Sequence, residues 1–185
     1  AFSDAGLPNH CVQMIDTPER EAVDYLLSMQ DYVDVIIPRG GKGLIEKINS
    51  ASKIPVIKHL DGICHVYVDK DADLKIAEKV VFNSKMRRPE ICGAAETLLI
   101  DSNLKNKAME ILQPLKNVNC EIRGDEFIQS LDKDFKKANG EDWSLEYLDK
   151  IISVKIVSDV EEAIKHINGY SSGHTESIIT NNEKT

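Results

Sequence analysis

The chain has 185 residues, of which 42% are hydrophobic, and a formal net charge of −8 at pH 7. This much apolar sequence can form the core of one good-sized domain or of two small ones. An acidic chain lacks the basic face that nucleic acid or an anionic membrane surface would require, which excludes both as partners. No apolar run approaches the length of a membrane span and no secretory signal is visible, so we expect a cytoplasmic protein.

The first third of the chain predicts alternating helices and strands. Apolar residues at helical spacing follow Thr17, the expected N-cap, and Pro18 in the first turn. Two β-branched runs lie on either side of the glycine-rich turn RGGKG. The expected elements are a helix over 17–30, a strand over 33–38, a helix over 44–52 and a strand over 54–58.

The rest of the chain continues this alternation. The expected strands cover 64–69, 96–101, 118–123, 151–157 and 176–180. The expected helices cover 74–88, 104–115 and 159–168. Asp71 or Asp73 can cap the first of these helices, whereas residues 124–150 read as a polar stretch. Strands alternating with helices predict an α/β fold with a mainly parallel sheet covered on both faces.

The ends of the chain look incomplete. The chain opens without an element of its own and stops soon after an expected strand, where a parallel α/β protein would normally continue into a helix. We therefore expect a piece of a longer protein, with its domain boundary near 59–62.

Four cysteines stand far apart in the sequence. Cys11, Cys64, Cys92 and Cys120 form no C-x-x-C pair, so their spacing indicates neither a structural zinc site nor a dithiol redox motif. We expect most of them to be reduced core residues and no metal to be bound.

Cys92 is the cysteine with a candidate role in chemistry. It follows a predicted helix that ends in Lys85, Arg87 and Arg88, and three nearby cations favour a thiolate. The small residues Gly93 and Ala94 leave room for a substrate carbonyl, and backbone N–H groups of the turn can hold an oxyanion. The alternative, a buried structural cysteine, is the commoner case, and the residues alone leave both readings open.

Other polar residues carry weaker signals. The RGGKG turn meets neither nucleotide-binding fingerprint, because no Ser or Thr follows Lys42 and the G-x-G-x-x-G spacing is absent. On the residues alone we interpret the following as structural or solvated: Cys64 and His65 on a strand, His166 on a helix, His174 in a loop, and Glu146 on the surface.

Five segments, taken together and in this order, resemble the gamma-glutamyl phosphate reductase family of the aldehyde dehydrogenase superfamily. The segments are 6–16, 34–45, 54–77, 83–101 and 143–180. The resemblance implies a three-layer αβα fold with a mainly parallel sheet, present here as a partial chain. It implies that 1–58 is the C-terminal part of a dinucleotide-binding domain and that 59–185 is a catalytic domain truncated at its C-terminus.

The resemblance also implies an activity. It is the NADPH-dependent reduction of L-glutamyl 5-phosphate to L-glutamate 5-semialdehyde, with release of phosphate, in proline biosynthesis. Cys92 would form a thioester, and the isolated chain is expected to be inactive. The resemblance further implies a homo-oligomer that receives its substrate by channelling from glutamate 5-kinase.

The resemblance assigns the site residues as follows: Cys92 as the catalytic thiol, Glu146, Arg39, Gly40 and Gly41 for the cofactor, and Arg87 and Arg88 for the substrate. Some members of the family carry Asn after the nucleophile, where this chain has Gly93, so the oxyanion hole should depend on backbone donors. Hydrolytic aldehyde dehydrogenases keep a water-activating glutamate where this chain has His59, with Asp61 close by. The alternatives are a hydrolytic aldehyde dehydrogenase and a non-catalytic folding or dimerisation fragment.

Overall fold

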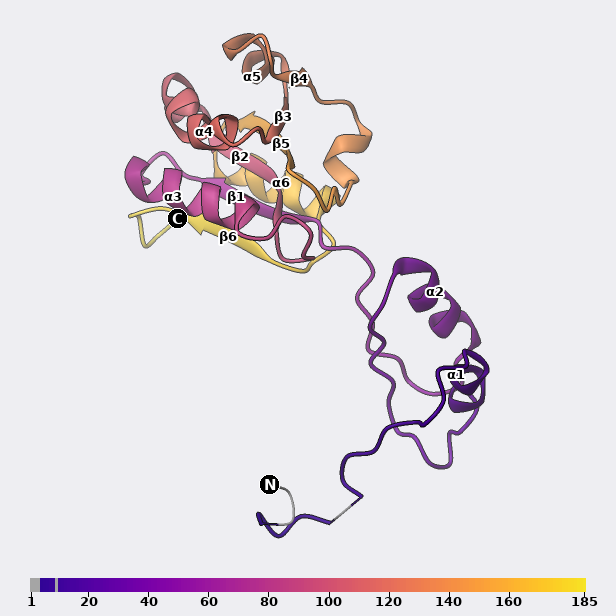
Figure 1. Ribbon diagram of the computed structural model, residues 1–185. Coiled ribbons are helices and arrows are strands. Elements are labelled where there is room, and N and C mark those ends of the chain that lie inside the picture. Colours follow the sequence, from indigo (N-terminus) through magenta and orange to yellow (C-terminus); the bar gives the residue numbers. More distant parts are fainter. Residues whose placement is uncertain (1–3, 9) are drawn as a thin grey trace. The chain divides into compact units, whose positions relative to one another are not determined.

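The computed structural model describes residues 4–8 and 10–185. The chain divides into two compact units, Ala1–Leu60 and Asp61–Thr185 (Figure 1). The assignment of 1–58 to a dinucleotide-binding domain and of 59–185 to a catalytic domain stays a prediction. In the described part of the chain, no helix combines the length and the apolar character that crossing a membrane requires.

The first unit is built on two short helices, α1 (Glu21–Leu26) and α2 (Lys42–Ala51). A salt bridge of 2.7 Å joins Lys47 of α2 to Asp24 of α1. The small apolar core of the unit consists of Leu27, Ile45, Ile48 and Ile54.

Two expectations for this unit need correction. The strands expected over 33–38 and 54–58 are reduced to one parallel bridge between Ile36 and Val56. Thr17 is not the N-cap of α1, because the cap position is Arg20 and the Thr17 hydroxyl accepts the N–H of Glu19 instead.

The second unit contains a six-stranded sheet with the order β4-β3-β5-β2-β1-β6. Its strands are β1 (Cys64–Val68), β2 (Ala95–Asp101), β3 (Glu121–Gly124), β4 (Lys136–Lys137), β5 (Ile151–Val157) and β6 (Glu176–Ile179). Every strand pair is parallel, so the expectation of a mainly parallel sheet is confirmed. All seven residues of the central strand β2 are buried, as expected for a strand covered on both faces.

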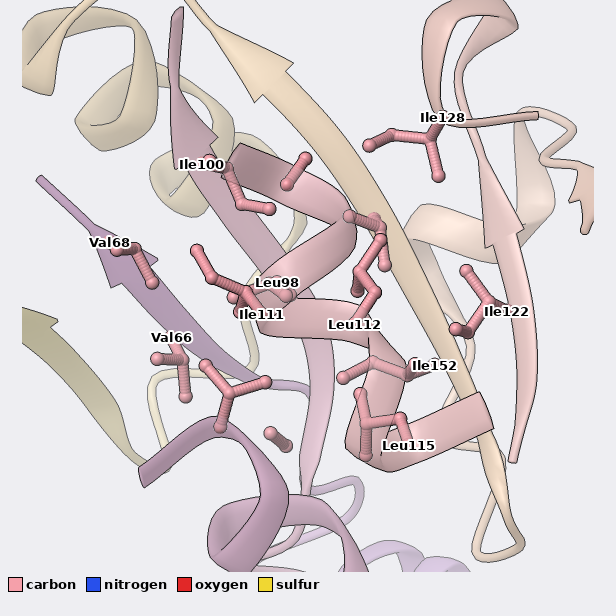
Figure 2. Close-up of a cluster of buried hydrophobic side chains, with 14 of the residues drawn as sticks. Val66, Val68, Leu98, Ile100, Ile111, Leu112, Leu115, Ile122, Ile128 and Ile152 are labelled. Atoms are coloured by element: carbon pink, nitrogen blue, oxygen red, sulfur yellow. The ribbon is translucent and has the colours of Figure 1, made fainter. Parts of the chain in front are cut away.

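Helices cover both faces of this sheet (Figure 1). One face packs against α3 (Leu74–Met86) and α4 (Ala108–Asn117), and the buried cluster between them includes Leu98, Ile111 and Ile152 (Figure 2). The other face packs against α6 (Val160–Tyr170), where strand residues such as Leu99 meet Ala163 of the helix. The second unit is therefore the expected three-layer αβα arrangement.

The polar stretch over 124–150 holds structure that the sequence did not predict. It contains α5 (Glu126–Leu131), the edge strand β4 and the 3₁₀ helix η2 (Glu141–Ser144). A second 3₁₀ helix, η1 (Ser102–Lys107), precedes α4. The N-cap of α3 is Asp73, one of the two expected candidates, and its side chain accepts the N–H groups of Lys75 and Ile76.

His166 is buried, which corrects its interpretation as a solvated helix residue. Its exposed fraction is 6%. Its ring centroid lies 5.2 Å from that of Trp143, 4.7 Å from that of Tyr170 and 5.6 Å from that of His65. Helical periodicity places this residue on the α6 face that packs against the sheet, and burial lowers its pKa to about 4.

This burial makes the stability of the unit depend on pH. A histidine in the unfolded chain titrates near 6.5, whereas folded His166 titrates near 4, so the unfolded chain binds more protons between these values. The free energy of unfolding should therefore fall as the pH is lowered from about 6.5 to about 4, with His166 contributing up to about 3 kcal/mol of the loss.

The check is urea unfolding of the wild-type chain and of His166→Phe at several pH values. Phenylalanine keeps an aromatic ring in the cluster and cannot titrate, so the variant should lose stability less steeply in acid. If the free energy of unfolding falls equally steeply with decreasing pH in the two proteins, His166 is not the group responsible.

Candidate active site

Cys92 lies in the segment 87–94, which connects α3 to β2. Two successive turns shape this segment: the N–H of Ile91 donates to the carbonyl of Arg88 at 3.3 Å, and the N–H of Ala94 donates to the carbonyl of Ile91 at 2.9 Å. Cys92 is exposed, whereas Cys64 and Cys120 are buried, and all four cysteines are free thiols. The turns carry Cys92 beyond the C-terminus of α3, whose dipole would disfavour an anion.

The segments around Cys92 meet at the amino edge of the sheet. Gly62 precedes β1, Cys92 precedes β2, Glu146 precedes β5 and His174 precedes β6. Open parallel sheets usually bind ligands at the opposite, carboxyl edge. In this unit the helix-to-strand connections, rather than the strand-to-helix connections, bring together the polar groups of the candidate site.

Gly62 is in close contact with the Cys92 backbone. A Cβ atom at position 62 would lie 1.9 Å from the Cys92 carbonyl oxygen, which is far closer than two non-bonded atoms can approach. Only glycine therefore fits at this position. The N–H of Gly62 donates to Oε1 of Glu146 at 2.8 Å. Gly62 therefore joins two of the residues assigned from the sequence, Cys92 and Glu146, which lie far apart along the chain.

Cys64 supports the same backbone from the first residue of β1. Its Sγ donates to the Cys92 carbonyl oxygen at 3.2 Å and lies 3.7 Å from Nδ1 of His174. Burial raises the pKa of Cys64 to about 11, so this thiol stays protonated at neutral pH and can donate. Nothing local in the sequence indicates this role, because the pairing of residues 64 and 92 is a tertiary contact.

The cations near Cys92 are fewer than the sequence suggested. Lys85 is fully buried, and its Nζ lies 2.6 Å from Oε2 of Glu96, so its charge is neutralised within the core. The expectation that Lys85 acts on the Cys92 thiol is wrong for this reason. Arg87 and Arg88 are exposed at the start of the Cys92 segment, and their role in substrate binding stays a prediction.

The turn leaves backbone donors near the thiol. The N–H of Ala94 is used within the turn, which removes one of the donors expected for an oxyanion. Within residues 4–8 and 10–185, the N–H groups of Cys92 and Gly93 have no hydrogen-bond acceptor. Gly93 faces His174, whose Cε1 would lie at van der Waals distance, 3.9 Å, from an added Cβ. These two N–H groups can therefore serve a substrate oxygen.

Glu146 is half-buried, and its contact with Gly62 uses only one carboxylate oxygen. A carboxylate has acceptor sites on both oxygens, so Oε2 can accept hydroxyl groups of a ribose. This second oxygen fits the ribose of a nicotinamide dinucleotide. The assignment of Glu146 to cofactor binding stays a prediction.

The residues expected to face the dinucleotide, Arg39, Gly40 and Gly41, lie in the first unit. Gly40 has φ of +155°, and Gly41 is the N-cap of α2, with no atom within 4 Å of a Cβ at that position. A cavity of about 520 Å³ in this unit is lined by Arg20, Val23, Gly41, Gly43, Leu44 and Lys47. An open helix N-terminus beside a cavity is compatible with a phosphate group.

His59, which the resemblance sets at the place of the water-activating glutamate, and the nearby Asp61 are each half-buried. Their effect on hydrolysis stays a prediction. Among the described residues, no group of three or more His, Cys, Asp and Glu side chains is arranged to hold a metal ion.

The contact at Gly62 generates a stability prediction. Gly62→Ala should destabilise the second unit by several kcal/mol, because the new methyl group collides with backbone rather than with a flexible side chain. Gly140→Ala is the matched control, since nothing lies within 4 Å of a Cβ at that position. Urea unfolding of both variants checks the prediction, and equal stabilities would contradict the close approach.

Comparison with known proteins identifies the family. A family model described as the aldehyde dehydrogenase family matches residues 1–120. A gamma-glutamyl phosphate reductase from Bartonella tribocorum is 52% identical over 176 residues, which cover 95% of this chain and 43% of that protein.

Solved structures agree with this similarity. The crystal structure of a gamma-glutamyl phosphate reductase from Thermotoga maritima matches with a TM-score of 0.88 and 38% identity, covering 99% of this chain and 44% of that one. An acetylating aldehyde dehydrogenase from Geobacillus thermoglucosidasius shares the fold, with a TM-score of 0.70, 23% identity, and coverage of 98% of this chain and 49% of that one. The chain thus spans less than half the length of the gamma-glutamyl phosphate reductases that it matches. Because this family model matches more than half of the chain, the chain belongs to the aldehyde dehydrogenase family.

Proposed function

We propose that this chain is the nucleophile-bearing part of an NADPH-dependent gamma-glutamyl phosphate reductase, which converts L-glutamyl 5-phosphate to L-glutamate 5-semialdehyde and phosphate. The observation that carries the proposal is the 52% identity, over 95% of the chain, to a protein of that name. An exposed thiol in a tight turn ahead of a buried strand supports it, because a nucleophile has to be accessible and rigidly supported.

The proposed reaction begins with attack by Cys92 Sγ, as the thiolate, on the carbonyl carbon of the acyl phosphate. A C–S bond forms, the C–O bond to phosphate breaks, and phosphate leaves with the bonding electrons. The developing oxyanion lies near the free N–H groups of Cys92 and Gly93. NADPH, when bound, would supply a hydride to the thioester carbon, which leaves an oxyanion on the carbon bound to Cys92 Sγ. The C=O bond re-forms from this oxyanion and the C–S bond breaks with its electrons passing to sulfur, so the aldehyde leaves and Cys92 is left as the thiolate.

The other assigned residues have binding roles in this proposal. Arg87 and Arg88, exposed at the start of the Cys92 segment, would bind the anionic groups of the substrate. Oε2 of Glu146 would accept ribose hydroxyls. The turn at 39–41 would face the dinucleotide. His59, in place of a water-activating glutamate, favours reduction over hydrolysis of the thioester.

The test of the nucleophile is Cys92→Ser in the full-length protein. Serine is similar in size but is a far weaker nucleophile at neutral pH, so acyl-phosphate reduction should fall below a tenth of the wild-type rate while the fold is kept. Without cofactor, the wild-type enzyme should release about one phosphate per active site and then stop. Rapid continued release would favour the hydrolytic alternative, and a Cys92→Ser enzyme with normal turnover would remove Cys92 from the mechanism.

Glu146→Gln tests the cofactor role. Glutamine keeps an acceptor oxygen for the Gly62 N–H but loses the charge that strengthens hydrogen bonds to ribose hydroxyls. A charge-assisted hydrogen bond contributes roughly 1.5–3 kcal/mol, so the apparent KM for NADPH should rise by about tenfold or more. Glu141→Gln, an exposed residue of η2, is the control. Unchanged cofactor kinetics in Glu146→Gln would return this residue to a structural role at Gly62.

A further inference from the structure

The second unit contains a buried ion pair that the proposed reaction does not use. Lys85, on the last turn of α3, and Glu96, on β2, have exposed side-chain fractions of 0% and 1%. Their Nζ and Oε2 atoms are 2.6 Å apart. Burial raises the pKa of Glu96, and the nearby ammonium group of Lys85 opposes this effect.

The ion pair joins the two ends of the segment that carries Cys92. Lys85 precedes Cys92 on α3 and Glu96 follows it on β2, so the whole of the segment 87–94 lies between them. Because the ion pair holds both ends of this segment, it reduces the number of conformations that the turns between them can adopt. The ion pair therefore limits where the Cys92 thiol can lie relative to the sheet.

Glu96 also holds the segment that presents Glu146. Its second oxygen, Oε1, accepts the N–H of Leu148 at 3.4 Å. Leu148 has φ of +51°, a left-handed conformation that a leucine adopts only when its surroundings enforce it. Nζ of Lys85 lies 5.9 Å from the centroid of the Tyr147 ring, next to Leu148 in the sequence. The same ion pair thus contacts the turn whose Glu146 binds Gly62.

Stability alone does not account for a buried ion pair. The desolvation of two charges commonly equals or exceeds their attraction, and apolar pairs of similar volume are often as stable. The geometry of this pair is specific, however: one carboxylate bonds the end of α3 through one oxygen and a strained turn through the other.

We propose that Lys85 and Glu96 are positioning residues, which set the Cys92 segment and the Glu146 turn in their working geometry. This inference rests on the proposed function of Cys92 and Glu146. Neither side chain touches the substrate or reacts. Each acts through the backbone that carries a residue of the site.

The test is the double variant Lys85→Met/Glu96→Leu in the full-length protein. Replacing both partners avoids leaving one buried charge unpaired and keeps the volume of the pair. The variant should fold, with circular dichroism and Tm close to those of the wild type. Its kcat should fall at least tenfold, while the KM for the acyl phosphate changes by less than about threefold, because a misplaced thiol slows the reaction more than binding.

The matched control is Lys116→Met/Asp132→Asn. This pair joins α4 to the residue after α5, outside the Cys92 segment, and is more exposed. It should leave kcat unchanged. A folded Lys85→Met/Glu96→Leu enzyme with wild-type kcat would overturn the proposal.

A second variant keeps the proposal testable if the double variant does not fold. Glu96→Gln keeps the shape of the side chain and an acceptor oxygen for Lys85 and Leu148 but removes the charge that pairs with Lys85, so positioning predicts a lower Tm and a kcat that falls less than tenfold. A loss as severe as that in Cys92→Ser would show that the carboxylate acts chemically and would overturn the proposal. A wild-type enzyme without acyl-phosphate reduction would instead refute the proposed function, which separates the two failures.

Discussion

The structure of the second unit depends on the burial of both faces of a parallel sheet. The central strand β2 is buried along its entire length, so its neighbours and the helices on either side have to exclude water together. Burial of apolar surface contributes roughly 25 cal/mol per Å², and Leu98 and Leu99, on opposite faces of β2, are both inaccessible to solvent. Two parallel strands have to be joined by a connection that returns along the sheet, usually through a helix. The segments that lead from a helix into the next strand therefore lie at one edge of the sheet, the edge where the strands begin.

The candidate site occupies that edge. β2 begins at Ala95, shortly after Cys92, and Gly62, just ahead of β1, packs against the Cys92 carbonyl. The thiol of Cys64 donates to the same carbonyl. A nucleophile supported in this way has its backbone held by β2 and by the start of β1, while its side chain stays exposed.

Buried polar groups occur on both faces of the sheet, and they differ in how they are satisfied. On the α3 face, Lys85 and Glu96 neutralise each other. On the α6 face, Nδ1 of His65 lies 3.1 Å from Oε2 of Glu176, whereas His166 is surrounded by aromatic rings and titrates at acid pH. The ion pair contacts the segments of the candidate site, and the histidine makes the stability of the fold sensitive to acid.

The sequence by itself determined the type and order of most elements, because hydrophobic periodicity is a local property. The runs at 64–69, 96–101 and 151–157 predicted strands, and the structure has β1, β2 and β5 there. The same reasoning missed α5 and β4. α5 is only six residues long and lies inside a polar stretch, which leaves its periodic signal short, and β4 pairs with β3 only through tertiary contacts.

For the site, the sequence identified Cys92 and Glu146 as candidates, through small neighbours and a family resemblance. Only the tertiary structure decided what surrounds them. It neutralised Lys85 with Glu96, buried His166 and placed Glu146 against Gly62. These outcomes depend on which residues, distant in the sequence, come into contact when the sheet forms. The burial, charge pairing and pKa of a side chain are set by those tertiary contacts rather than by its neighbours along the chain.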